Sequence, residues 1–168
     1  MKLTKKDRLL LINQYKILER ISPEDSEHYS ELISILENGY SIFYSMVDDW
    51  ISEDMTESEC NLVLQILSIY RMIEDRKRVD KDEALLNHTH SYFRGFDGNN
   101  ETSLMSFARF LIFDQNKFSE QLDYLSKNDR LNSHTPMKNK YQRMIDKWNG
   151  MSDKWDVSTN DLVEILNS

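Results

Sequence analysis

Four side chains have settings that could support chemistry: Asp97, Arg109, Tyr141 and Arg143. Asp97 belongs to a loop at residues 95–100 that is rich in Gly and Asn, and Arg109 interrupts an apolar stretch at residues 104–113. A buried guanidinium without a partner is unfavourable, so Arg109 must extend to solvent, pair with a carboxylate, or face a cavity or a subunit interface. We expect it to be mostly buried and paired with Asp97.

These side chains permit two interpretations. In the first they form a structural polar cluster with an ion pair between Asp97 and Arg109. In the second they line a ligand pocket near the loop at residues 95–98, because a carboxylate and a guanidinium can orient a substrate and stabilise its charge. Tyr141 is expected in the core, and Arg143 at the surface or on a neighbouring backbone. No nucleophile or general base can be named, so the catalytic residues are unknown.

The histidines and acids do not have the spacing of a metal site. His88 and His90 lie two residues apart, whereas helical zinc pairs usually lie four apart, and no third ligand follows at a characteristic spacing. The string that begins at Asp97 resembles a calcium loop, but Thr102 and Ala108 occupy the positions where an EF-hand needs Gly and an acid. We therefore expect neither a metal nor another cofactor.

The element that must organise the chain is a long helix predicted at residues 56–79. Thr56 and Glu59 form a capping box at its start, and no Gly or Pro interrupts it. Apolar side chains cover more than half of its circumference in two rows, formed by Leu62, Ile66, Ile69 and Ile73 and by Cys60, Val63, Leu67 and Tyr70. Because so wide an apolar face needs cover on two sides, we expect other helices to pack around it.

Shorter helices are predicted on both sides of this central helix from capping residues, Gly stops and apolar periodicity. The segment at residues 40–51 has the composition of a strand, but its apolar spacing favours a helix and no partner strand is evident elsewhere. The loop at residues 95–100 is the clearest break, and Asn100 can cap the helix that follows. The other expected helices span residues 4–20, 22–38, 80–93, 104–113 and 135–149, with a last one from residue 158. We predict an all-α fold, a compact single-domain bundle over residues 1–168 with about seven helices.

Composition narrows the classes of function. The net charge is −8, and residues 48–59 hold six acids without a base, so the surface repels nucleic acid and anionic lipid. A basic cluster at residues 2–8 could still bind nucleic acid, and this is the weakest alternative function. No stretch approaches the roughly 20 apolar residues that cross a bilayer, and the lone Cys60 excludes an internal disulfide. We expect a cytoplasmic protein that binds neither nucleic acid nor membrane.

The first helix predicts self-association. Leu9 and Ile12 lie across this helix from the side that carries Leu10, Leu11 and Leu18, and a single covering layer cannot bury both sides. A second subunit would cover the spare face, and a dimer is favoured. The alternative is that the irregular segment at residues 114–133 folds back over the spare face and leaves a monomer.

Several short strings distributed over nearly the whole chain resemble the YfbU family of bacterial proteins. They are Asn13-Gln14-Tyr15-Lys16, Gly39-Tyr40, Thr56-Glu57 with Cys60, Gly95-Phe96-Asp97, Arg109-Phe110, Thr135-Pro136-Met137, Lys140-Tyr141-Gln142-Arg143-Met144 and Trp148. The resemblance implies a small cytosolic protein and no particular reaction, because the family has no established biochemical function. Asp97, Arg109, Tyr141 and Arg143 fall within these strings, which makes them the side chains to test first.

The sequence thus favours a small homo-oligomeric interaction or regulatory protein, on the basis of its surplus apolar helix surface, its acidic exterior and the absence of a catalytic motif. The identity of any further protein partner is unknown. The alternative is a small-ligand-binding protein or an enzyme that uses Asp97 and Arg109 in a pocket near the loop at residues 95–98.

Overall fold

The computed structural model describes residues 2–152 and 157–168, and it confirms an all-α fold. Within these residues there are seven α-helices and several shorter helical turns, with no β-strand. The chain divides into two compact units, Met1–Asp54 and Met55–Ser168, and each has an apolar core of its own. We call them the N-terminal unit and the C-terminal unit. The single domain expected over residues 1–168 stays a prediction.

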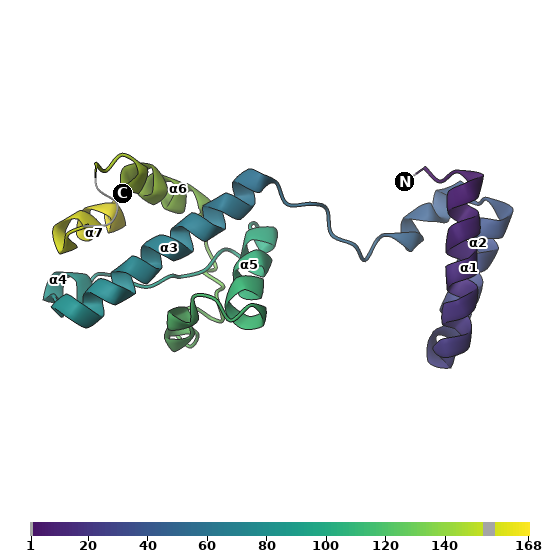
Figure 1. Ribbon diagram of the computed structural model, residues 1–168, viewed down its shortest axis with the longest axis horizontal. Coiled ribbons are helices and arrows are strands. Elements are labelled where there is room, and N and C mark those ends of the chain that lie inside the picture. Colours follow the sequence, from purple (N-terminus) through teal and green to yellow (C-terminus); the bar gives the residue numbers. More distant parts are fainter. Residues whose placement is uncertain (1, 153–156) are drawn as a thin grey trace. The chain divides into compact units, whose positions relative to one another are not determined.

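The N-terminal unit is a pair of helices that lie side by side, α1 (Lys5–Ile21) and α2 (Ser26–Asn38), joined by the short 3₁₀ turn η1 (Pro23–Asp25) (Figure 1). The predicted capping box of Thr4 with Asp7 is present at the start of α1. The predicted stop is also present, because Gly39 ends α2 in the left-handed conformation that glycine adopts most easily. The core of this unit lies mainly on α2, which buries Leu32, Ile33, Ile35 and Leu36.

A helix was predicted at residues 40–51 in preference to a strand, and this choice is confirmed. The helix is shorter than expected and is the 3₁₀ helix η2 (Ser41–Val47). A 3₁₀ helix has three residues per turn, so side chains three apart lie on the same side. Tyr44 and Val47 have this spacing, and both are buried against α2. The spacing of these two buried side chains therefore fits a 3₁₀ helix.

In the C-terminal unit the predicted central helix is confirmed as α3 (Glu57–Asp80), with the capping box of Thr56 and Glu59 formed as expected. Both predicted apolar rows are buried except at Cys60, which is half-buried. Ile66 is fully buried. Figure 1 shows α3 crossing this unit, and it contacts α4, α5, α6 and α7.

The helix predicted at residues 80–93 is reduced to one turn, α4 (Glu83–Leu86), capped by the Asp82 carboxylate. Leu85 is the one residue of this turn that is buried, so the segment has no apolar stripe whose packing could stabilise a longer helix. Next comes α5 (Thr102–Arg109), followed by the π-helical turn η3 (Phe110–Asp114). The N-cap residue of α5 is Glu101 and not Asn100, so the predicted cap is wrong.

The irregular segment predicted after residue 114 has one short 3₁₀ helix, η4 (Ser119–Tyr124), and Phe118 and Leu131 join the core of the C-terminal unit from it. Two more α-helices complete this unit: α6 (Lys138–Asn149) and α7 (Thr159–Leu166). The predicted capping box of Ser158 with Asp161 is present at the start of α7.

Candidate functional site

The loop at residues 95–101 is held tightly against the segment at residues 128–133. Gly95 has a φ of 85°, and a Cβ placed on it would lie 1.9 Å from the Leu131 carbonyl oxygen. The Phe96 amide donates to this same oxygen, with an N–O distance of 3.1 Å. The Asn132 side-chain oxygen accepts from the Gly98 amide at 3.0 Å. Glycine at position 95 is therefore required by the close approach of two backbones.

Asp97 is buried, with 3% of its surface exposed, but it has no ion pair with Arg109 among the described contacts. Its carboxylate accepts from the Asn99 amide at 3.1 Å and from the Asn100 side-chain amide. These hydrogen bonds, that from Asn100 first, lower the pKa of Asp97. The predicted Asp97–Arg109 pair is therefore wrong, because the loop itself satisfies the carboxylate.

Arg109 is half-buried at the end of α5, where its Nε donates to the Arg130 carbonyl oxygen at 3.0 Å. Most of its surface is thus covered, as expected, although its partner is a backbone oxygen and not a carboxylate. A long side chain can cover apolar surface with its methylene groups while its head reaches a polar group at the edge. The guanidinium thus links the end of α5 to the segment before Leu131.

Tyr141 is in the core, as predicted. It is fully buried on α6, and its hydroxyl donates to the Gly95 carbonyl oxygen at 3.0 Å. Its ring packs against Phe93 and Phe96, with centroid separations of 5.5 and 5.3 Å. Burial raises the pKa of the Tyr141 phenol well above its usual value. The phenol therefore stays protonated and ties α6 to the glycine loop.

Arg143 is exposed on α6, and its Nη1 donates to the Asn139 carbonyl oxygen one turn earlier at 3.1 Å. Of the four predicted side chains, Asp97 and Tyr141 meet at the same loop, Arg109 has a separate backbone partner, and Arg143 lies on the solvent side of its helix. Their role in binding a ligand stays a prediction.

Sequence reasoning missed Glu101, the side chain that joins most elements at this loop. Its buried carboxylate accepts from the Asp97 amide at 3.0 Å, from the Met137 amide at 2.9 Å and from the Lys138 amide at 2.7 Å. It therefore caps the start of α6 from a residue far away in the sequence, where negative charge also suits the helix dipole. One signal for this contact was available: Met137, the N-cap residue of α6, provides no side-chain cap of its own.

A second missed cluster surrounds Lys77, which is buried near the end of α3. Its ammonium group donates to Glu74 at 2.7 Å, to the Ser91 carbonyl oxygen, and to the Tyr124 hydroxyl at 3.3 Å. The Tyr124 hydroxyl in turn donates to the other Glu74 oxygen at 2.8 Å. Burial and the Glu74 carboxylate raise the pKa of Tyr124. Every charge here is paired, so the cluster joins α3 to the segments around residues 91 and 124.

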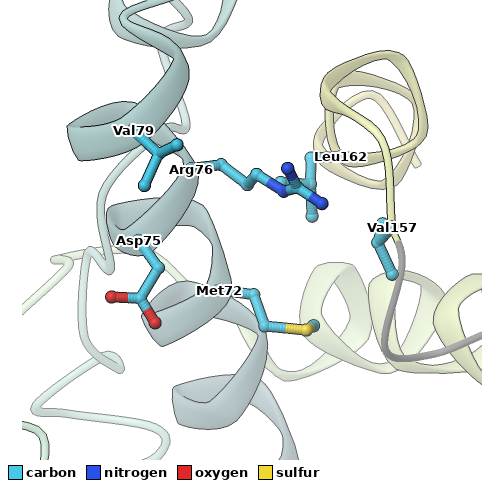
Figure 2. A pocket seen from close by; sticks show the side chains of 6 residues that line it. All are labelled: Met72, Asp75, Arg76, Val79, Val157 and Leu162. Atoms are coloured by element: carbon cyan, nitrogen blue, oxygen red, sulfur yellow. The ribbon is translucent and has the colours of Figure 1, made fainter.

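A cavity of about 290 Å³ lies between α3 and α7. Figure 2 shows the Arg76 side chain extending from α3 toward Leu162 of α7, whereas the Asp75 carboxylate points away from α7. The rest of the lining is apolar, formed by Met72, Val79 and Val157. Arg76 already has an ion pair with Asp80, at 3.6 Å. The cavity therefore offers apolar walls and a guanidinium that the protein itself engages.

Within residues 2–152 and 157–168, no group of three or more His, Cys, Asp or Glu side chains is placed to hold a metal ion. None of the helices formed by these residues is both long and apolar enough to span a membrane.

The N-terminal unit carries a different kind of feature, a row of exposed apolar side chains on α1. Leu10, Ile17 and Ile21 are 55%, 60% and 68% exposed. At about 100° per residue, these three and Gln14 fall within an arc of about 60°. We call these four residues the α1 face. Leu9 is also exposed, on the neighbouring side of the helix.

The predicted composition of the spare face of the first helix needs correction. Ile12, which was expected to lie on it, is 8% exposed and belongs to the core that α1 shares with α2. Leu10, which was expected on the covered side, is exposed instead. The apolar surplus predicted for this helix is therefore real, but it lies about Leu10, Ile17 and Ile21.

These observations define an all-α protein in which two compact helical units are built around separate apolar cores. A sequence model of the YfbU domain matches residues 1–168. The chain is also 44% identical over 169 residues to the UPF0304 protein MJECS11 of Methanocaldococcus jannaschii, with 99% of each chain covered. The chain therefore belongs to the YfbU family, as the short strings predicted. No biochemical function is established for this family. Because this relative is archaeal, the bacterial origin expected from the resemblance stays a prediction.

Proposed function

We propose that this chain is a cytoplasmic interaction protein that acts as a homo-oligomer, with a dimer as the basic assembly and the α1 face as the surface of association. The observation that carries the proposal is the exposure of Leu10, Ile17 and Ile21 on one side of α1. Scattered apolar side chains on a surface are ordinary, whereas three in one row on a helix are typical of a helix–helix contact.

The energetics are compatible with a reversible dimer. Burying one Leu or Ile side chain contributes roughly 1.5–3 kcal/mol, so three from each of two copies contribute on the order of 10 kcal/mol. Association itself costs about 4–15 kcal/mol in lost translational and rotational freedom. Six side chains at the upper value of about 3 kcal/mol each leave a net gain of up to roughly 14 kcal/mol after the smallest association cost. A micromolar dissociation constant needs a net gain of about 8 kcal/mol, which lies within this range, so we expect assembly to depend on concentration in the micromolar range.

The test is the mass in solution, measured by light scattering and analytical ultracentrifugation over a range of micromolar concentrations. A single chain has a mass of 20.1 kDa, and we expect a mass of twice this value at the upper concentrations. The double variant Leu10→Lys with Ile17→Lys should return the mass to that of one chain without loss of helicity. A wild-type protein that stays monomeric throughout would contradict the proposal.

A matched control separates the effect of the surface from the effect of added charge. Leu86 is also exposed, at 47%, but it lies on α4 in the C-terminal unit. Leu86→Lys adds the same side chain at a comparable site, so it should leave the dimer intact. If Leu86→Lys dissociates the dimer as strongly as the α1 double variant, the assigned surface is wrong.

A further inference from the structure

The charge at the start of α1 is opposite in sign to the charge around its end, where the chain turns through η1 into α2. Residues 2–8 hold four cations and one acid, a net charge of +3, and residues 19–27 hold four acids and one cation, a net charge of −3. The cations are Lys2, Lys5, Lys6 and Arg8, and the acids of the second group are Glu19, Glu24, Asp25 and Glu27. The α1 face runs between these groups, from Leu10 to Ile21.

This arrangement is complementary to itself in one orientation. If two copies of α1 were parallel, +3 would face +3 at one end and −3 would face −3 at the other. If they are antiparallel, each basic end faces an acidic end, and the two helix dipoles also oppose each other favourably. Like charges placed side by side penalise the wrong orientation, as the charged flanks of coiled coils do.

We infer that the α1 face binds the same face of a second copy in antiparallel orientation, with the basic start of each α1 beside the acidic end of the other. The inference rests on the self-association proposed above and adds its geometry. A two-fold axis makes the contact isologous, so the assembly closes at two copies and does not extend into a filament.

The apolar spacing also selects a register. Leu10, Gln14, Ile17 and Ile21 follow one another at intervals of four, three and four residues, which is the seam of a two-helix contact. An antiparallel pair keeps charged side chains out of the seam when Leu10 lies opposite Ile21 of the second copy and Ile17 lies opposite Gln14 of the second copy. The two-fold axis then passes between residues 15 and 16. In this register Lys6 of each copy lies near the acidic segment at residues 24–27 of the other.

Disulfide cross-linking tests the orientation, in a background in which the single native cysteine is removed by Cys60→Ser. A disulfide needs two Cα atoms within about 7 Å. In the antiparallel register, Leu10 lies eleven residues along the axis from Leu10 of the second copy, a separation of about 16 Å. We therefore expect Leu10→Cys and Ile21→Cys to cross-link efficiently when the two proteins are mixed, and each to cross-link at least tenfold less on its own.

The outcomes distinguish this inference from the proposed function. Efficient cross-linking of Leu10→Cys with itself would show a parallel pair, which overturns the orientation and leaves the dimer in place. A doubled mass without cross-links in any mixture would show that another surface is used, which overturns the inference. A monomeric mass in the Cys60→Ser background and in the wild type overturns the proposed function itself.

Salt provides a second readout of the same arrangement. Attraction between opposite ends is screened as the ionic strength rises from about 0.05 to 0.5 M, because the Debye length falls to a few ångströms. We expect the dimer dissociation constant to rise several-fold over this range. A dissociation constant that falls with salt would indicate like charges at the contact and would overturn the antiparallel assignment.

Discussion

In the C-terminal unit, α3 is covered by helices on several sides, and the side chains along both of its apolar rows are buried except for the half-buried Cys60. In the N-terminal unit, α1 is covered by α2 on one side, and the opposite side exposes Leu10, Ile17 and Ile21. Both α1 and α3 are amphipathic helices that begin with a capping box. The difference is in the number of covering elements, which decides whether an apolar face becomes a core or remains a surface for association.

The largest expected effect comes from placing the same charge on each of these two helices. Ile66→Asp should abolish folding of the C-terminal unit, because an unpaired carboxylate in a closed core costs several kcal/mol. Leu10→Asp should leave the N-terminal unit folded, since that side chain already faces solvent. Amide hydrogen exchange of peptides from α1 and α3 follows each unit separately. A soluble Ile66→Asp variant with protected α3 amides would show that α3 is not the centre of its core.

Two glycines with positive φ provide the next comparison. Alanine in this conformation lowers the free energy of unfolding by about 1–2 kcal/mol at either position. At Gly39 a Cβ would approach the end of the flexible Arg8 side chain, at 2.7 Å, whereas at Gly95 it would lie 1.9 Å from the Leu131 backbone oxygen. We therefore expect Gly39→Ala to cost about 1–2 kcal/mol and Gly95→Ala clearly more, since a backbone must move.

Chemical denaturation checks this ranking, with Gly150→Ala as the control. Gly150 has a φ of −78°, and a Cβ there would have ordinary contacts of 3.5 Å or more, so its replacement should have little effect. Equal losses of unfolding free energy for Gly39→Ala and Gly95→Ala would mean that the loop at residues 95–101 accommodates a Cβ as easily as the end of α2 does.

The smallest effect concerns two capping boxes, that of α1 in the N-terminal unit and that of α3 in the C-terminal unit. Hydrogen bonds from Thr4 and Thr56 lower the pKa of Asp7 and Glu59. A carboxylate whose pKa is lowered in the folded state contributes stability above its unfolded pKa, of about 4, and loses it as the pH falls through the folded pKa. We therefore expect Asp7→Asn and Glu59→Gln to be less stable than the wild type at pH 7 and to approach it at low pH.

The measurement is the free energy of unfolding of each variant and of the wild type between about pH 7 and pH 3. Both side chains are half-buried at a helix start, so the two units should respond alike. A difference from the wild type that persists at low pH would show that the substitution acts through lost packing and not through charge.

Local sequence signals predicted much of the fold correctly. The capping boxes at Thr4, Thr56 and Ser158 all form, and Gly39 ends α2 as expected. These signals succeed because a side chain and the backbone amide that it caps are three residues apart, so no distant contact is involved. The apolar rows of α3 succeeded for a similar reason, since their width alone required cover on more than one side.

The contacts of the candidate side chains depended on tertiary structure. Asp97 was expected to need a distant guanidinium, but Asn99 and Asn100 satisfy it, and Arg109 instead reaches the Arg130 carbonyl oxygen. Charge type alone does not identify a partner, because a carboxylate can accept from a neutral amide as well as from a guanidinium. Which donor it meets depends on how the chain folds around it.

The sequence by itself determined the helical class, the central helix, the main helix starts and the membership of the YfbU family, through local capping, apolar periodicity and family strings. Only the tertiary structure decided that Glu101 caps α6 across 36 residues, that Tyr141 binds the Gly95 carbonyl oxygen, and that Ile12 rather than Leu10 is buried. The physical reason is the same in each case. A helix pattern specifies which side chains share a face, but the neighbouring element that reaches this face determines whether it is buried, capped or left exposed.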